Sequence, residues 1–173
     1  MTLCITVCYY YYFIVVAVLI INYFDIMKFI IDFEGYQVHG VWYPVEIALL
    51  NTETKVCFVH YVYYYQQYDN LTTQYQFKRH GLHWSDGYEA LSSALLSISQ
   101  KLTNTDSIHV KGHEKAEIVR QWFPNICVVE MNENDIPSLL LMTHSKDAVC
   151  YRHARDTSLC CARRKAWQLM EYV

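Results

Sequence analysis

Three side chains with metal-binding chemistry lie close together near the end of the chain, at Cys150, His153 and Cys160. Thiolate and imidazole groups are the usual ligands of small closed zinc sites, and two intervening residues let the first cysteine and the histidine reach one ion. Cys161 is an alternative to Cys160 as the third ligand. A zinc ion bound here is expected to pin a loop to the helix that follows, and it needs a fourth ligand. Buried thiols and a core histidine are the alternative interpretation.

A pair of carboxylates offers a second kind of chemistry. Asp32 and Glu34 stand two residues apart after an apolar, β-branched run, so both side chains are expected on one face of a strand. Two-metal nucleases use such a pair to hold Mg²⁺ or Mn²⁺ against a scissile phosphate. A solvated turn at the end of a strand has the same pattern, so the pair alone does not establish a catalytic site.

Basic side chains are frequent around the cysteines, where they could contact nucleic-acid phosphates. The predicted contacts are Arg152, Arg155, Arg163, Arg164 and Lys165. A solvated helix face would carry the same residues. A tyrosine-rich stretch over residues 61–75, followed by Lys78 and Arg79, is a candidate for base stacking, and strand packing is its alternative.

The composition indicates one folded domain. The chain has 173 residues, of which 53% are hydrophobic and 18% charged, and this excludes wholesale disorder. The net charge of −3 does not favour strong non-specific binding of polyanions, so any nucleic-acid surface has to be local. The seven cysteines form no regular framework and are interpreted as reduced thiols, which predicts the cytoplasm or the nucleus.

The N-terminal segment points to a different location. Residues 3–24 contain no charged side chain and are numerous enough for a membrane-spanning helix. Met27 begins a strand-like run that looks like the natural start of a domain. The sequence therefore divides into a hydrophobic segment at 1–26, which is either a membrane anchor or an upstream extension of the reading frame, and a domain at 27–173.

Strand-like and helix-like patterns alternate through this domain. Strands are predicted at 28–33, 45–50, 56–63, 107–111 and 126–130, and helices at 91–102, 113–123 and 157–172. Residues 86–89 resemble a capping box before the first helix, and residues 64–84 are expected to be irregular. A hairpin opening followed by strand–helix alternation predicts an α/β fold of ribonuclease-H type, a mixed sheet with helices on both faces. The N-terminal segment would add a hydrophobic helix.

The carboxylate pair and this order of elements resemble the proofreading-type exonucleases known as the DEDDh group. That family carries Asp-x-Glu in its first strand, as at Asp32 and Glu34, and a further Asp in a helix after its fourth strand. The helix expected at 113–123 offers Glu114 or Glu117 instead. The resemblance implies a remnant catalytic set of Asp32, Glu34 and Glu117.

The late motif of those exonucleases is more strongly altered. Their His-x4-Asp falls on Cys160 and Lys165 in this chain. Lysine does not ligate Mg²⁺, and cysteine is a poor substitute for a general-base histidine. The resemblance therefore implies a degenerate exonuclease site.

With cysteine and lysine in place of that histidine and aspartate, the chain resembles a second family, the Maelstrom domain of the piRNA pathway. This domain is a ribonuclease-H-like fold with a Glu-Cys-His-Cys zinc site. Its late motif is similar to Cys150, His153, Cys160 or Cys161, and Ala162. Its glutamate lies in a Pro-x-Glu-Ile segment, which is similar to residues 44–47 here. The resemblance implies Glu46 as the fourth ligand of a structural zinc ion, and single-stranded RNA as the substrate class.

Three functions are consistent with these motifs. The first is a zinc-stabilised ribonuclease-H-like domain that binds single-stranded RNA or DNA and cuts it weakly or not at all, in small-RNA silencing or a mobile element, with silencing proteins as partners. The second is a non-catalytic protein-interaction module. The third is a metal-dependent 3′–5′ exonuclease of the DEDDh type, which needs Mg²⁺ or Mn²⁺ at its carboxylates.

Overall fold

The computed structural model describes residues 26–66, 68, 70–132, 134, 136 and 161–173. The hydrophobic segment up to residue 25 lies outside these described residues, and so do the predicted ligands and basic contacts between residues 150 and 160: Cys150, Arg152, His153, Arg155 and Cys160. Among the helices that are described, none is long and apolar enough to span a membrane.

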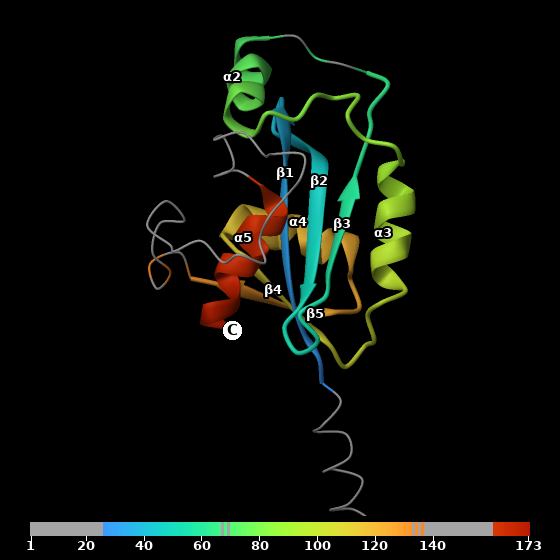
Figure 1. Ribbon diagram of the computed structural model, residues 1–173, viewed down its shortest axis with the longest axis vertical. Helices are drawn as coiled ribbons and strands as arrows, with labels where there is room; N and C mark the ends of the chain where they lie inside the picture. The colour runs from blue at the N-terminus through green and yellow to red at the C-terminus, as the bar shows by residue number, and fades with distance from the viewer. Residues whose placement is uncertain (1–25, 67, 69, 133, 135, 137–160) are drawn as a thin grey trace, which may run out of the picture.

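The described part of the chain forms an α/β domain with a five-stranded mixed sheet and four α-helices (Figure 1). The strands are β1 (Lys28–Val38), β2 (Val41–Asn51), β3 (Cys57–Tyr61), β4 (Ser107–Lys111) and β5 (Cys127–Met131). The helices are α2 (Leu71–His80), α3 (Leu91–Ser99), α4 (His113–Trp122) and α5 (Ala162–Leu169), followed by the 3₁₀ helix η4 (Met170–Tyr172). Each strand and helix predicted from the sequence overlaps one of these elements.

The sheet has the strand order β3-β2-β1-β4-β5. β1, β2 and β3 are antiparallel neighbours, whereas β4 runs parallel to β1 and β5 runs parallel to β4. The turn between β2 and β3 is held by Asn51, whose side-chain oxygen accepts hydrogen bonds from the amides of Glu53 and Thr54 at 2.9 and 2.8 Å. The central strand β1 therefore joins an antiparallel half of the sheet to a parallel half.

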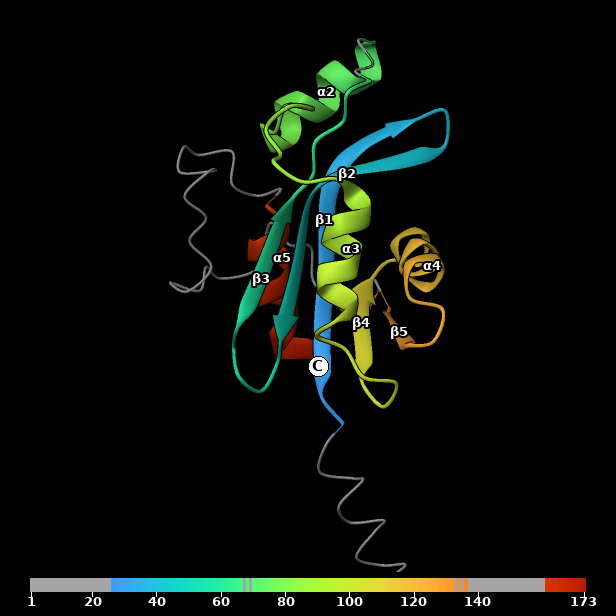
Figure 2. The same ribbon diagram turned by 90° about the vertical axis from the view of Figure 1, so that its right-hand side faces the viewer.

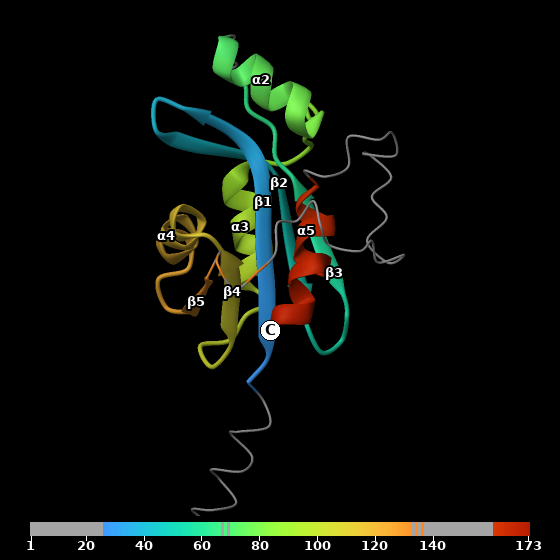
Figure 3. The same cartoon turned by 90° about the vertical axis from the view of Figure 1, so that its left-hand side faces the viewer.

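Helices cover both faces of the sheet, as the sequence predicted. Successive side chains of a strand point to opposite faces, so Phe29, Ile31 and Phe33 join one apolar cluster with α3 and α4. Ile30 joins the opposite cluster, in which Ala166 of α5 packs on the sheet. Figure 2 shows the face covered by α3 and α4, and Figure 3 shows the opposite face, covered by α5. Asp32 and Glu34 share the alternation of Ile30 and therefore belong to the α5 face.

β1 continues beyond the end of its partner β4. The pairing of β1 with β4 covers Lys28–Ile30, so Asp32 and Glu34 lie past it, at the C-terminal end of the parallel strands. The predicted end of this strand at residue 33 was wrong, because β1 passes through a bulge between Glu34 and Gly35 and runs to Val38. A Cβ at Gly35 would lie 2.1 Å from a backbone oxygen of β2, so the bulge requires glycine.

The expectation that residues 64–84 are irregular was also wrong, because this stretch contains α2. The helix begins with a capping box, in which the Asn70 side chain accepts from the Thr73 amide at 2.9 Å and Thr73 accepts from the Asn70 amide at 3.0 Å. It ends at Gly81, which adopts the left-handed conformation with φ 69°. The two end signals outweigh the weak helix propensity of a segment rich in Thr and aromatic residues.

The predicted capping box at residues 86–89 does not cap a helix. α3 begins later, at Leu91, and its N-cap residue Ala90 makes no side-chain hydrogen bond. The Asp86 carboxylate instead accepts a hydrogen bond from the His83 amide at 2.6 Å, which closes a turn before the helix.

Candidate functional site

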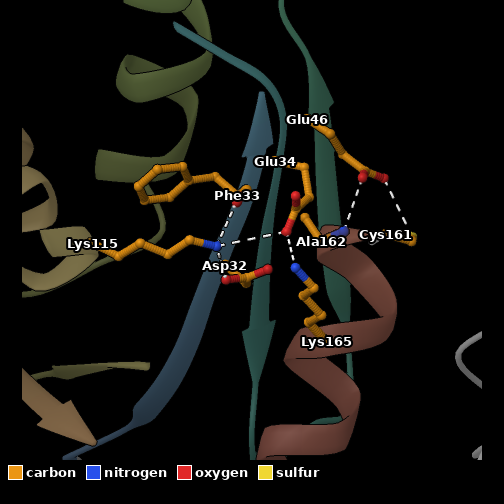
Figure 4. Close-up of polar contacts among 8 residues, drawn as sticks. All are labelled: Asp32, Phe33, Glu34, Glu46, Lys115, Cys161, Ala162 and Lys165. Atoms are coloured by element: carbon orange, nitrogen blue, oxygen red, sulfur yellow. Dashed lines mark hydrogen bonds and ion pairs between the residues drawn. The ribbon is translucent and has the colours of Figure 1, made fainter. Parts of the chain in front are cut away.

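Four charged side chains meet where β1 projects beyond β4 (Figure 4). Asp32 and Glu34 come from β1, Lys115 from α4 and Lys165 from α5. The Lys115 ammonium lies 2.5 Å from Asp32 Oδ1 and 3.8 Å from Glu34 Oε1. The Lys165 ammonium forms an ion pair with Glu34 Oε1. We call these four residues the carboxylate–lysine cluster.

The sequence places Lys115 in the cluster through the connection from β4 to α4. Gly112, at φ 91°, turns the chain directly from β4 into the first turn of α4. Lys115 then reaches across the open edge of β1 and donates a hydrogen bond to the Phe33 carbonyl at 2.6 Å. Its ammonium also lies 4.8 Å from the centre of the Phe33 ring. The backbone and the ring therefore fix the position of this ammonium, in addition to the carboxylates.

The cluster is buried and balanced in charge. Asp32, Glu34 and Lys165 are 3%, 7% and 6% exposed, and the Lys115 side chain is 18% exposed. Two carboxylates face two ammonium groups, so the cluster has no formal net charge when all four groups are ionised. Buried charges are tolerated when each has an opposite partner and hydrogen bonds, which is the arrangement here.

Burial has a measurable consequence for Asp32. Removal from water raises the pKa of its carboxyl group above the ordinary value of 3.8, and the nearby Lys115 and Lys165 ammonium groups oppose that rise. Its second oxygen, Oδ2, is buried and has no hydrogen-bond partner among the described residues. The Asp32 carboxylate is therefore the least well satisfied member of the cluster.

The third predicted carboxylate, Glu117, is not part of this cluster. Glu117 lies on the exposed side of α4 and pairs with Arg120 on the same helix. Glu114 also points elsewhere, because it accepts hydrogen bonds from Gln37 at 2.5 Å and from the Trp42 indole at 2.9 Å. Lys115, which directly follows Glu114, is the residue of α4 that points towards Asp32, since residues on one helix point in different directions within a turn.

Glu46 forms a second buried carboxylate site beside the cluster. It is 0% exposed and stands opposite Glu34 in the pairing of β1 with β2. Its Oε2 accepts a hydrogen bond from the Ala162 amide at 2.9 Å, and its Oε1 lies 3.5 Å from the Cys161 sulfur (Figure 4). The Tyr61 hydroxyl donates a hydrogen bond to the same Oε1 at 3.3 Å. Glu46 therefore caps the N-terminus of α5 from the neighbouring sheet, at a helix whose own N-cap residue provides no side-chain bond.

The donors around Glu46 fit one part of the predicted zinc site. A carboxylate oxygen and a thiol within 3.5 Å of each other can ligate one zinc ion, and Cys161 is the alternative to Cys160 that the sequence left open. The described residues contain no group of three His, Cys, Asp or Glu side chains that could hold a metal. Any further ligands from Cys150, His153 and Cys160 belong to the stretch outside the described residues.

The predicted nucleic-acid contacts of α5 differ in their exposure. Arg163 and Arg164 are partly exposed, whereas Lys165 is buried in its ion pair with Glu34. Burial also lowers the pKa of Arg164 below its ordinary value of 12.5, although the group keeps its charge at neutral pH. Arg163 and Arg164 are therefore the more exposed of the three predicted contacts on this helix.

The sequence analysis missed Lys115, and it predicted Lys165 as a nucleic-acid contact and not as a partner of the carboxylates. Lys115 had a signal, because it lies in the helix after the fourth strand, where the exonuclease resemblance places a carboxylate. The sequence also contained a signal for the role of Lys165, since this residue falls on the aspartate of the His-x4-Asp motif of the exonucleases. A lysine at the position of an expected metal ligand suggests an ion pair, but the sequence alone does not show that Lys115 and Lys165 both meet the carboxylates.

The chain was compared with models of known protein families and with curated proteins. No family model matches it, and no curated protein matches it at a significant level.

Proposed function

We propose that this chain is a non-catalytic ribonuclease-H-like domain that binds single-stranded RNA. The sheet order β3-β2-β1-β4-β5, with an antiparallel first half, a parallel second half and helices on both faces, supports the ribonuclease-H-like assignment. One observation supports the absence of catalysis in this proposal: the Lys115 and Lys165 ammonium groups form ion pairs with the two carboxylates that would have to hold catalytic metals.

Electrostatics explains why the carboxylate–lysine cluster excludes two-metal chemistry. Mg²⁺ or Mn²⁺ needs carboxylate oxygens with free lone pairs in an open site. A divalent ion held 4 Å from one ammonium group is repelled by about 8 kcal/mol at an effective dielectric constant of 20, and the cluster contains two such groups. The residues present do not fit a catalytic metal pair, so no hydrolytic step is assigned to Asp32 and Glu34.

The RNA ligand rests on the Maelstrom-like resemblance and on the arginines of α5. Arg163 and Arg164 follow the buried N-terminus of this helix, and both are partly exposed. Zinc held by Glu46 with Cys150, His153 and Cys160 or Cys161 would supply a structural cross-link between β2 and the base of α5. In this proposal the chain itself binds RNA, and the metal only stabilises the binding surface.

The proposal is tested by measuring binding and cleavage on the same protein. The full chain is mixed with a fluorescein-labelled single-stranded RNA, and anisotropy is recorded as a function of salt and protein concentration. Saturable binding with no shortening of the RNA in Mg²⁺ or Mn²⁺ is expected. Arg163→Ala with Arg164→Ala should weaken binding and reduce its salt dependence, because each removed phosphate contact lowers the slope by about one unit.

A gain-of-function variant tests the reason given for the missing activity. Lys115→Asp with Lys165→Asp would restore four carboxylates at the cluster and is expected to bind Mn²⁺, detected by the relaxation of water protons. Lys101→Asp with Lys111→Asp makes the same change in net charge elsewhere and should bind no Mn²⁺. RNA cleavage by the unaltered chain that is abolished by Asp32→Asn would overturn the proposal in favour of an exonuclease. Absence of RNA binding would leave the protein-interaction module.

A further inference from the structure

An aromatic pocket lies between α2, the segment after it and the far end of β1. Its volume is about 320 Å³, and its walls include four aromatic rings. These are Tyr68, Phe77, His83 and Trp84. Tyr36 of β1 and Thr73 and Gln74 of α2 complete the lining. Neither the carboxylate–lysine cluster nor the Glu46 site contributes a lining residue, so this is a separate site.

The two buried rings of the lining, Tyr36 and Trp84, form the inner wall of the pocket, and other contacts hold them in place. The rings of Tyr36 and Trp84 are stacked, with centroids 3.9 Å apart and planes within 10°. The Tyr36 hydroxyl donates a hydrogen bond to the Leu82 carbonyl at 2.6 Å, and the His80 ring accepts one from the Leu82 amide at 3.1 Å. Burial raises the pKa of Tyr36 to about 12, so its hydroxyl keeps this proton at neutral pH. The wall therefore exists before any ligand binds.

The outer wall is accessible. Phe77 is 42% exposed, and its ring meets the His83 ring edge to face, with centroids 6.0 Å apart. Both side chains line the pocket, and both are exposed to solvent. A planar ligand can reach these rings without unfolding α2.

We propose that this pocket binds one unpaired nucleobase of a single-stranded RNA. The volume is at the lower end of the range for ligand sites, which fits one flat ring system and not a larger ligand. Aromatic walls suit a base because every base has a π face, and stacking of this kind tolerates different sequences. The imidazole of His83 and the amide of Gln74 bring polar atoms to the same lining, where a base has hydrogen-bonding edges.

Positive charge lies next to the pocket on the same helix. Gln74 and Phe77 face the pocket, and Lys78 follows Gln74 by four residues, so the two side chains are neighbours along α2. Lys78 and Arg79 are exposed, and the first turn of α2 contains no acidic residue. A base in the pocket therefore places its own phosphate within the field of a basic helix end, which favours a nucleotide over an uncharged aromatic ligand.

The test compares two exposed aromatic residues of one helix. Phe77→Ala removes a pocket wall, whereas Tyr75→Ala removes a 67% exposed ring that does not line the pocket. With the full chain and a labelled single-stranded RNA, Phe77→Ala is expected to raise Kd about 5- to 150-fold, the range for loss of one stacked base. Tyr75→Ala should change Kd less than twofold. Phe77→Leu keeps the apolar volume and should also weaken binding, so it replaces the alanine variant if that variant fails to fold.

A second probe separates this inference from the proposed function on which it rests. Adenosine monophosphate alone should show line broadening in ligand-observed NMR with the unaltered chain and none with Phe77→Leu. RNA binding that is equally strong in the unaltered, Phe77→Leu and Tyr75→Ala proteins would refute the pocket and leave the proposed function intact. If the unaltered chain binds no RNA but still binds the nucleotide, and Phe77→Leu abolishes that nucleotide binding, the proposed function is refuted and the base-binding pocket stands. A pocket that binds a phenylalanine-containing peptide but not the nucleotide would overturn the inference.

Discussion

Removing one ammonium group from the carboxylate–lysine cluster should destabilise the protein strongly. Lys165→Met keeps much of the side-chain volume but leaves two buried carboxylates facing one ammonium group. Breaking a buried ion pair by removing one partner costs about 3–5 kcal/mol. The remaining Lys115 ammonium is 3.8 Å from Glu34 and partly compensates, so we expect the lower end, about 3 kcal/mol. For a chain of this length that loss lowers Tm by roughly 6–12 °C.

The matched double variant identifies the cause of the loss. Lys165→Met with Glu34→Met restores the balance of charge, because Asp32 and Lys115 remain as one pair. An apolar pair of similar volume is often neutral or stabilising in place of a buried ion pair, so the free energy of unfolding should return to within about 1 kcal/mol of the unaltered value. Arg120→Met, at the exposed pair with Glu117, is the control and should cost less than about 1 kcal/mol.

Urea unfolding followed by circular dichroism at neutral pH, under reducing conditions, measures these free energies. A single variant Lys165→Met that loses less than about 1 kcal/mol would show that the ion pair is not buried as described. A double variant as unstable as the single one would show that the lost side-chain packing, and not the unpaired charge, is responsible.

The same variant should respond to pH in a defined direction. Burial raises the pKa of Asp32, so the folded protein binds this proton more tightly than the unfolded chain, and Asp32 lowers stability as pH rises from 3.8 through its folded pKa. Loss of the Lys165 charge raises that pKa further, because this ammonium group opposes the rise. The destabilisation by Lys165→Met should therefore shrink as the pH is lowered. A cost that stays constant or grows on acidification would contradict the reasoning.

Two further predictions concern the backbone and the histidines. Gly35→Ala should lower the free energy of unfolding in urea by roughly 3 kcal/mol, because its Cβ would meet a β2 backbone oxygen at 2.1 Å. Gly40→Ala is the control: a Cβ there meets open space, but φ is +79°, so it should cost about 1 kcal/mol. Equal costs for the two variants would contradict the bulge geometry. NMR titration should place the pKa of His113 above 6.5, because of its hydrogen bond to Glu130, and that of His109 below 6.5, because it is partly buried. Protonated His113 then stabilises the fold at low pH, and this contribution is lost as pH rises through its folded pKa. Neutral His109 stabilises the fold above pH 6.5, and this contribution is lost as pH falls through its folded pKa. The reverse order of the two pKa values would refute the assignment.

The positions of most strands and helices follow from the sequence alone. Short apolar, β-branched runs indicate β1 and β2, and the 3.6-residue period indicates α3 and α4, because both patterns depend on which side chains leave water. The expectation failed for α2, where two weak helix formers, Thr72 and Thr73, concealed a capped helix. Its capping box and the terminal Gly81 were present in the sequence, so this helix was predictable in principle.

The chemistry of the site depended on the tertiary structure. The sequence identified Asp32 and Glu34 as a pair on one face, since that follows from the two-residue period of a strand. The sequence did not establish which cations meet them, because Lys115 and Lys165 are 83 and 131 residues away from their partners along the chain. Their meeting depends on β1 extending past β4 and on α4 and α5 packing on opposite faces of the sheet. Residue types thus defined the available charges, and the packing of distant elements decided that these charges neutralise one another in a buried cluster.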